Sequence, residues 1–280
     1  MTHRLNQLNE SMKSLQVAHQ LINKDVLLIG GGDVAMTRIP KLLPTGCKIT
    51  LISPHLHHKL KLKYFNPMKC GENWTPESQS IYNIIETEFR DSYLDIEKKN
   101  WTLILTCIPN RVESERIFNL CKEKYGPQQM INVADIPHLC DFYFGANVAL
   151  TTDGNLQILI SSNGLSPRFT ALIKDEIGSM FQDWELDGAL EKLGQLRERI
   201  RGLTQLEIDV KYRMSWIKTC TDTFGLKYCH SIDVDKLVSL FQRMASMQPP
   251  SLQFPSRDTM LNDYSITTTA KAASFSSSSL

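Results

Sequence analysis

The sequence lacks the features that mark membrane, secreted and nucleic-acid-binding proteins. It has no apolar run close to the roughly 20 residues that a membrane-spanning helix needs. Its first residues, MTHRLNQLNESMK, contain no apolar segment of a secretory signal, and the final Ser-Ser-Leu lacks the basic residue of a peroxisomal signal. The 31 basic and 30 acidic side chains nearly cancel, so the charge implies no nucleic-acid partner. We therefore expect a cytoplasmic protein that binds neither nucleic acid nor membrane.

The cysteines show neither a disulfide pattern nor a zinc-binding pattern. The seven cysteines are odd in number and include no C-x-x-C pair. This argues against a disulfide framework and a structural zinc site, and it favours a reducing compartment. The HLHH run from His55 to His58 has no cysteine or carboxylate beside it, so we interpret it as solvated loop histidines. We predict no resident metal site.

What the sequence does contain is a buried strand that runs through a glycine turn into a helix, DVLLIGGGDVAMTRIPKLL from Asp25 to Leu43. The turn fits the G-x-G-x-x-A form of the dinucleotide-binding motif, whose small residues let the backbone approach a pyrophosphate and let the helix pack on the strand. The helix opens at Asp33, and N–H groups at such an end point at phosphates. A tight turn without a ligand is the alternative. The predicted cofactor-binding residues here are Gly30, Gly32, Asp33 and Val34.

The carboxylate that normally holds the adenosine ribose is missing. It should close the second strand, roughly 20 residues after the glycines, but the strand expected over Lys48–Ser53 is followed by Pro54-His55-Leu56. The Ser53 hydroxyl or the loop backbone could bind the ribose instead. The absence weakens the case for NAD, and the nearby histidines and Lys59 leave binding of the NADP 2′-phosphate open. The residues expected to face the adenosine are Ser53, Pro54, His55 and Leu56.

Strands and helices continue to alternate after this point. Residues 59–79 are polar and aperiodic, which indicates a long surface insertion. A third strand is expected to end near Phe89, which could face the adenine or pack in the core. WTLILTCI (Trp101–Ile108) and MINVAD (Met130–Asp135) read as the fourth and fifth strands, with the helix RVESERIFNLCKEKYG between them. The pattern predicts an α/β fold with a Rossmann-type doubly wound parallel sheet, which binds ligands at the carboxyl ends of its strands.

Asp135 stands at the end of the fifth predicted strand, directly after the apolar run INVA. In a parallel sheet this residue and the glycine turn share one edge. One interpretation makes Asp135 a helix N-cap or a turn residue before Ile136-Pro137. The other makes it a carboxylate that faces the nicotinamide and the substrate and takes up a proton. Position alone does not decide between the two.

Several stretches together resemble the siroheme synthase family, and most closely its fungal bifunctional members. They are GGGDVAMTR, PTGCKITLISP, INVADIPHLCDFYFGANV, LQILISSNGLSPRFTALIKDEI and FGLKYCHSIDV. The resemblance runs from about Ser14 to about Tyr264. It implies NAD-dependent oxidation of precorrin-2 to sirohydrochlorin, followed by insertion of ferrous iron as a substrate to give siroheme. It also implies a homodimer, with Asp135 matching the aspartate that serves both reactions and His230 as a further acid-base or iron-contacting group.

Precorrin-2 is rich in carboxylates, so its site should be wide and basic. The predicted substrate-binding residues are Arg38, Ser166, Arg168 and Lys174, although Ser166 could simply cap the helix that starts at Pro167. The later segments are amphipathic and predict a helical C-terminal half. The predicted organisation is a polar extension (1–13), an NAD-binding Rossmann domain (14–147), a dimerisation region (148–190), a small helical C-terminal domain (191–264) and a disordered tail (265–280).

Other classes of protein share the glycine turn. A methyltransferase would use it to bind S-adenosylmethionine, but it also wants an acid at the end of the second strand, which this chain lacks. An NAD-binding redox-sensing module without catalysis is the remaining alternative. Turnover of precorrin-2 with NAD separates these possibilities.

Overall fold

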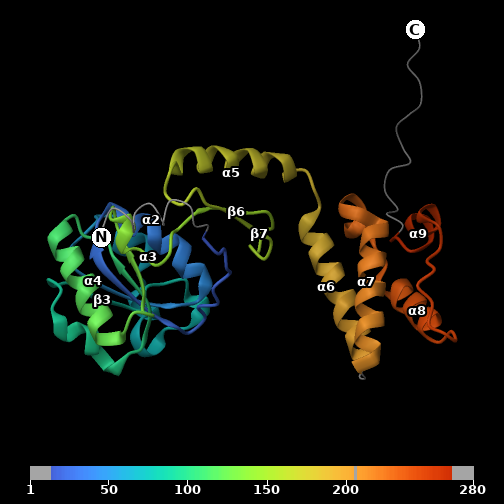
Figure 1. The fold of residues 1–280 in the computed structure, drawn as a ribbon, viewed down its shortest axis with the longest axis horizontal. Helices are drawn as coiled ribbons and strands as arrows, with labels where there is room; N and C mark the ends of the chain where they lie inside the picture. Colours follow the sequence, from blue (N-terminus) through green and yellow to red (C-terminus); the bar gives the residue numbers. More distant parts are fainter. Residues whose placement is uncertain (1–13, 205–206, 267–280) are drawn as a thin grey trace, which may run out of the picture. The chain divides into compact units, whose positions relative to one another are not determined.

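A computed structural model describes residues 14–204 and 207–266 of the chain (Figure 1). The chain divides into two compact units. The first contains the described residues up to Ala146 together with Leu159–Ala171, and the second contains Asn147–Ile158 and the described residues from Leu172 onward. The predicted polar extension (1–13) and nearly all of the predicted tail lie outside the described residues.

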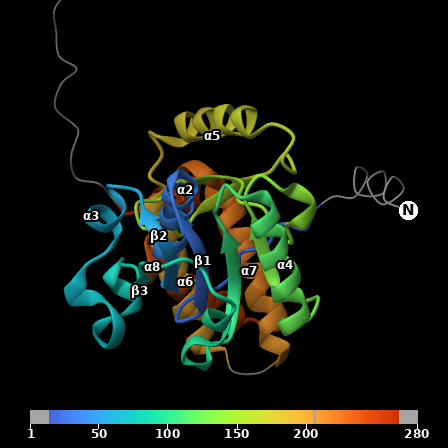
Figure 2. The same cartoon turned by 90° about the vertical axis from the view of Figure 1, so that its left-hand side faces the viewer.

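A five-stranded sheet forms the centre of the first unit (Figure 2). Its strand order is β3-β2-β1-β4-β5, and every neighbouring pair is parallel. The strands are β1 (Asp25–Gly31), β2 (Lys48–Leu56), β3 (Asn83–Ile85), β4 (Trp101–Thr106) and β5 (Met130–Val133). This topology confirms the predicted doubly wound α/β fold of Rossmann type.

Two helices cover opposite faces of this sheet. Val26 of β1 belongs to the buried cluster that includes α2 (Asp33–Leu42), and the next residue, Leu27, belongs to the cluster that includes α4 (Arg111–Tyr125). Successive side chains of a strand point to opposite faces. After Asp25, the residues of β1 are therefore apolar throughout, because the strand is buried on both sides (Figure 2).

Two strands end differently from the prediction. Strand β2 continues through Pro54 to Leu56, because the N–H of His57 donates to the carbonyl of Gly31 (2.7 Å) and holds the strand end beside β1. The predicted end at Ser53 was therefore too early. Strand β3 has only three residues, so Phe89 lies beyond it and packs against the core on the α4 side.

Two further strands, β4 and β5, end earlier than predicted. Strand β4 ends at Thr106 rather than Ile108, and β5 ends at Val133 rather than Asp135. The N–H of Ala134 still donates to the carbonyl of Thr106 (2.9 Å), after which the chain turns away. Asp135 therefore lies in the turn that follows β5.

The predicted surface insertion contains local structure. It holds helix α3 (Leu60–Tyr64) and short 3₁₀ helices, and its Leu60, Tyr64 and Trp74 are buried. The indole N–H of Trp74 donates to the carbonyl of Ser80 (2.8 Å). The 3₁₀ helices of the described chain are Leu43–Thr45, Pro67–Lys69, Gly71–Asn73, Pro76–Ser78, Asp91–Lys98, Pro137–Leu139 and Cys229–Ser231.

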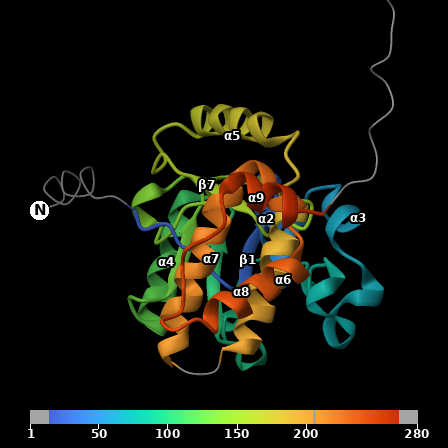
Figure 3. The same cartoon turned by 90° about the vertical axis from the view of Figure 1, so that its right-hand side faces the viewer.

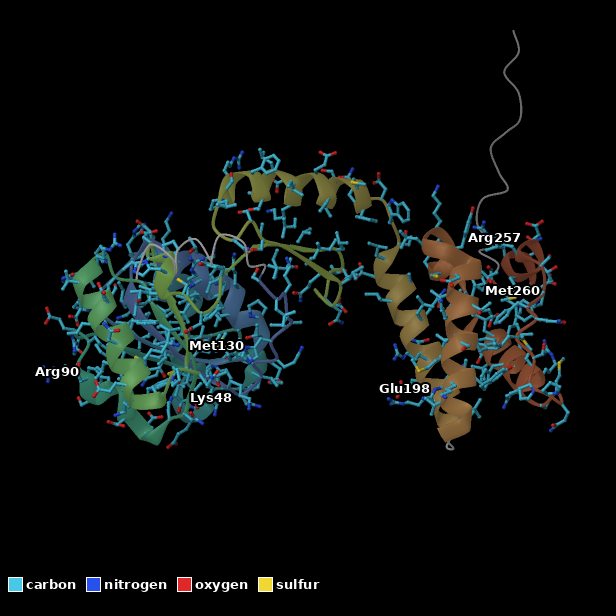
Figure 4. All side chains as sticks on the ribbon, viewed as in Figure 1. Lys48, Arg90, Met130, Glu198, Arg257 and Met260 are labelled. Carbon is cyan, nitrogen blue, oxygen red and sulfur yellow. The ribbon has the colours of Figure 1, made fainter. Side chains whose placement is uncertain are left out.

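A second, two-stranded sheet and a long helix follow the Rossmann sheet. The sheet pairs β6 (Ala146–Ala149) with β7 (Gln157–Ile160), and the sequence analysis missed β6. Helix α5 spans Pro167–Phe181, so Pro167 takes the predicted first helical position. Side chains stand out from α5 along its length (Figure 4).

The second unit ends in a group of helices (Figure 3). Trp216 lies at its core, packed edge-on against Phe241 with ring centroids 5.3 Å apart. In Figure 4, the labelled Met260 is fully buried and the labelled Glu198 is exposed. The helices are α6 (Leu186–Leu203), α7 (Glu207–Tyr228), α8 (Val234–Ala245) and α9 (Arg257–Asp263).

The described structure continues past the predicted start of the tail. Ser265 pairs with Ile232 in an antiparallel bridge, and the N–H of Ile266 donates to the carbonyl of Ser231 (2.7 Å). In the part of the chain that the structure describes, no helix is long and apolar enough to span a bilayer.

Candidate functional site

The glycine turn packs tightly on the ends of the neighbouring strands. Gly30 has φ +102°, and a Cβ atom there would lie 2.5 Å from the carbonyl oxygen of Cys107. A Cβ atom on Gly31 would lie 2.5 Å from the Leu56 side chain. Only glycine fits at position 30, because the clash there is with backbone and φ is positive, whereas at position 31 the Leu56 side chain would have to move.

Gly32 is different because the space over it is open. Its φ is −86°, and a Cβ atom there would have no neighbour within 4 Å. It is the N-cap of α2, and no side chain caps the N–H groups of the first turn. The N–H groups of Asp33 and Val34 and the positive end of the helix dipole therefore suit a pyrophosphate. The site fits a dinucleotide.

Ser53 ties β2 to the glycine turn. Its side chain is buried, its Oγ accepts a hydrogen bond from the N–H of Gly31 (3.0 Å), and its hydroxyl donates to the carbonyl of His55 (2.7 Å). The one hydroxyl proton is thus already used, which leaves an acceptor position for a ligand. Binding of the ribose by Ser53 stays a prediction, and the hydroxyl has a structural role as well.

The loop histidines lie beside the glycine turn. Nε2 of His57 is 3.6 Å from Oδ1 of Asp33, whose side chain is almost fully exposed. The His57 ring lies 4.3 Å from the His58 ring, between centroids. Among the described residues, no three His, Cys, Asp or Glu side chains form a group that could hold a metal ion. Lys59 follows these histidines directly, and its backbone N–H donates to Nδ1 of His57 (3.2 Å), so the group combines imidazoles and a lysine with the Asp33 carboxylate beside it.

Asp135 is exposed in the turn after β5, and its backbone is left-handed, with φ +58°. Its carboxylate has no hydrogen-bond or ion-pair partner among the described residues. The following 3₁₀ helix starts at Pro137, with Ile136 as its N-cap and no side-chain cap. The N-cap interpretation of Asp135 was therefore wrong, although the residue does belong to a turn. The carboxylate is available to a ligand.

Arg38 on α2 is a cation without a counter-ion in the described chain. Its Nε is buried without a hydrogen-bond partner, and its guanidinium lies over the Phe144 ring, with Cζ 4.7 Å from the centroid. Burial raises the pKa of the Cys107 thiol to about 12, and the charge of Arg38 opposes that rise. The charge of Arg38 thus acts on Cys107, which follows β4 and packs on Gly30. A half-buried guanidinium whose buried Nε has no hydrogen-bond partner favours an anionic ligand.

The other predicted substrate-binding residues fall in different units. Arg168 is exposed at the start of α5 in the first unit. Beside it, the backbone N–H of Ser166 donates to Oγ of Ser162 (3.0 Å). Lys174 belongs to the second unit, where Nζ lies 3.1 Å from Oδ1 of Asp175.

His230 lies in the second unit, next to α6. Its backbone carbonyl accepts a hydrogen bond from Nζ of Lys192 (2.7 Å), and its Cβ lies beside Gly188. Its imidazole has no partner among the described residues. The catalytic role of His230 stays a prediction.

Sequence reasoning missed two residues near Arg38. Phe144 supplies the ring under the guanidinium, and Nζ of Lys41, one helical turn after Arg38, donates to the carbonyl of Gly145 (2.8 Å). The i, i+3 spacing of Arg38 and Lys41 was the available signal, because it places both on one helix face. Nothing in the sequence linked that face to Phe144, which lies more than 100 residues further along the chain.

The fold and the glycine turn define a protein with an NAD(P)-binding domain. A family described as putative NAD(P)-binding matches residues 17–146. Two families described as the central and C-terminal parts of a sirohaem biosynthesis protein match residues 153–180 and 184–250.

Two relatives that match over most of their length identify the family to which the chain belongs. The chain is 50% identical over 272 residues to a siroheme biosynthesis protein of Saccharomyces cerevisiae, covering 90% of this chain and 98% of that protein. It is 31% identical to a siroheme biosynthesis protein of Schizosaccharomyces pombe, covering 82% and 80%. The chain belongs to the family of siroheme biosynthesis proteins that these two yeast proteins represent. The solved structure named SirC, precorrin-2 dehydrogenase, shares the fold, with a TM-score of 0.57 and 18% identity over 82% of this chain and 100% of that one.

Proposed function

We propose that this protein oxidises precorrin-2 to sirohydrochlorin with NAD and then inserts ferrous iron to form siroheme. The observation that carries the proposal is the unpartnered Asp135 carboxylate on the same sheet edge as the glycine turn. Ile29 pairs with Thr106, and Thr106 pairs with Val133. The ends of β1 and β5 are thus two strand spacings apart, about 10 Å. That separation suits a nicotinamide on one side and a proton acceptor on the other.

The proposal assigns a role to the glycine turn, to Asp135 and to His230. The N-terminus of α2 and the open space at Gly32 would hold the pyrophosphate, and bound NAD would supply the hydride acceptor. Asp135 would take up the proton that leaves the tetrapyrrole during oxidation. In the second reaction ferrous iron would replace two pyrrole N–H protons, and the same carboxylate could accept these protons and pass them to solvent. His230 is proposed as a second acid-base group.

We propose that Arg38 binds a carboxylate of the tetrapyrrole, with Arg168, Lys174 and Ser166 as further contacts. Arg38→Gln should raise KM for precorrin-2 about tenfold or more, because a hydrogen bond to a charged group contributes ~1.5–3 kcal/mol. KM for NAD should not change. Steady-state kinetics on both substrates measure the effect, and Arg38→Lys should recover part of the affinity.

The matched control for Arg38 is Arg116→Gln. Arg116 also lies on a helix of the first unit, but its guanidinium is engaged by Asp91 and Glu113. That variant should keep both KM values. Unchanged KM for precorrin-2 in Arg38→Gln would remove Arg38 from the substrate site.

NAD rather than NADP is the proposed cofactor, on the strength of the family resemblance. The Asp33 carboxylate beside His57 supports this choice, because it would oppose a further phosphate there. A clear kinetic preference for NADP would instead assign the histidines after Ser53 to the 2′-phosphate.

We propose a homodimer formed through the region 148–190. The support is α5, all of which the structure describes, and in which Thr170 is the only buried residue of the helix. Phe169, Leu172 and Met180 of this helix are 61%, 48% and 62% exposed. A second copy related by a two-fold axis would cover this apolar surface.

Leu172→Asp should therefore weaken or abolish the dimer, since each subunit would lose about 1.5–3 kcal/mol of apolar burial. Light scattering at micromolar concentration should give the dimer mass for the wild type and a shift towards the monomer for the variant. Leu62→Asp, which changes a 90% exposed leucine on α3, is the control and should remain dimeric. A monomeric wild type would contradict the proposal.

A cytoplasmic location is also proposed. All seven cysteines are free thiols, which fits a reducing compartment. Fractionation of cells with an antibody against the chain would test this.

Absorption spectroscopy tests the function directly. Purified protein mixed with precorrin-2 and NAD should produce the spectrum of sirohydrochlorin, and ferrous iron should then convert it to that of siroheme. Binding of NAD without any change in precorrin-2 would favour the redox-sensing alternative. Oxidation without iron insertion would limit the activity to the dehydrogenase step.

A further inference from the structure

The loop that carries Asp135 is closed at its base by Asp141. The N–H of Ile131 on β5 donates to Oδ2 of Asp141 (2.8 Å), and the N–H of Asp141 donates back to the carbonyl of Ile131 (2.8 Å). Nζ of Lys122 on α4 lies 2.7 Å from the same carboxylate oxygen. Strand β5 is at the edge of the sheet, so the Asp141 carboxylate takes the place of a neighbouring strand.

Cys140 makes a second set of hydrogen bonds across the loop, closer to Asp135 than those of Asp141. Its Sγ accepts from the N–H of Val133 (3.3 Å) and donates to the carbonyl of Val133 (3.1 Å). Burial raises the pKa of this thiol, so at neutral pH it keeps the proton that it donates. One side chain thus satisfies both backbone groups of the last residue of β5.

The segment between these contacts contains a residue with a left-handed backbone. Asp135 has φ +58°, a conformation that aspartate adopts more readily than most non-glycine residues. The hydroxyl of Tyr143 also donates to the carbonyl of Pro137 (3.0 Å), on the far side of the loop. Asp135 itself contributes no side-chain bond among the described residues. The side chains of Cys140, Asp141 and Tyr143 therefore hold the loop, and the Asp135 carboxylate is exposed on it.

We propose that Cys140 and Asp141 are positioning residues that fix the Asp135 carboxylate for proton transfer. This inference rests on the proposed function, in which Asp135 is the proton acceptor. A small misplacement of a catalytic group is enough to cost about 100-fold in rate. The two side chains act only through the loop, so they should affect turnover and leave substrate binding alone.

Cys140→Ala tests this inference. It should lower kcat for both reactions about tenfold or more, while KM for NAD and for precorrin-2 stays within about twofold. Cys140→Ser should recover part of kcat, because a hydroxyl can also accept from and donate to Val133. Hydrogen exchange provides a readout without catalysis: the Val133 amide should exchange faster in Cys140→Ala than in the wild type. Cys121→Ala, which truncates a buried thiol on α4, is the matched control and should keep kcat even if it melts earlier.

A double-mutant cycle separates this inference from the proposed function. If Cys140 acts through Asp135, Cys140→Ala should cause no further loss of kcat in an Asp135→Asn background. Full activity of Asp135→Asn alone would overturn the proposed function. An inactive Asp135→Asn together with undiminished kcat in both Cys140→Ala and Asp141→Asn would overturn only the positioning role. Equal fold losses of kcat in the wild-type and Asp135→Asn backgrounds would overturn it as well.

Discussion

Replacing Asp135 by asparagine is expected to lower both precorrin-2 oxidation and iron insertion by ~100 to 10,000-fold, the usual effect of removing a general acid-base group. Asparagine is the informative substitution because it keeps the size of the side chain and tolerates the left-handed backbone at φ +58°. Alanine would add a backbone penalty of about 1–2 kcal/mol and so mix strain with the loss of the carboxylate. Since the carboxylate makes no bond within the described chain, its removal should hardly change stability.

Three measurements on Asp135→Asn test whether Asp135 is the proton acceptor: turnover in both reactions, the melting temperature, and the affinity for NAD. We expect only the first to change. Asp95→Asn is the matched control, because Asp95 forms an exposed ion pair with Lys124 in the same unit and should not influence turnover. If Asp135→Asn keeps its specific activity, the proton acceptor must be another residue.

The second large effect is expected at Gly32. Gly32→Asp should abolish detectable NAD binding, because the side chain and its negative charge would occupy the open space in which the pyrophosphate is proposed to lie. The fold should not suffer, since no atom lies within 4 Å of the added Cβ and the φ of −86° suits any residue. Aspartate is also a favoured N-cap residue, so the variant could gain a few tenths of a kcal/mol over glycine.

The test combines calorimetric titration with NAD and an assay of iron insertion into supplied sirohydrochlorin. Binding should be lost, while insertion of iron should survive. Gly194→Asp is the control, because an added Cβ there also meets open space, but Gly194 lies on α6 of the second unit and is not part of the glycine turn. Gly30→Ala offers a contrast: with φ +102° and the Cys107 carbonyl 2.5 Å from the new Cβ, it should destabilise the protein. Undiminished NAD affinity in Gly32→Asp would contradict the assignment of the turn.

Local patterns were enough to predict the order of the elements. The apolar run of β1, the glycines and the alternation of strands with helices follow from short-range rules, so the parallel sheet was expected and was found. The strand ends were less predictable, because a strand continues for as long as a neighbour supplies hydrogen bonds. Strand β2 passes Pro54 because Gly31 accepts the N–H of His57, a partner that lies elsewhere in the sequence.

Some residues of the candidate site could be predicted from the sequence, whereas some of their contacts could not. The glycines and Asp135 were found from the sequence, because each stands at the end of an apolar strand and parallel strands bring such ends to one edge. The hydrogen bond that Ser53 accepts from Gly31 and the Phe144 ring under Arg38 could not be found, because each joins segments distant in the sequence.

The Rossmann sheet, the glycine turn and the family could all be recognised in the sequence, since they depend on the order and spacing of residue types along the chain. Which polar groups are occupied and which are available emerged only from the folded chain. Asp141 and Asp135 are both carboxylates of one loop, yet Asp141 is held by Ile131 and Lys122 while Asp135 has no partner among the described residues. The availability of a group depends on what folds against it, and the pattern of one short segment does not contain that information.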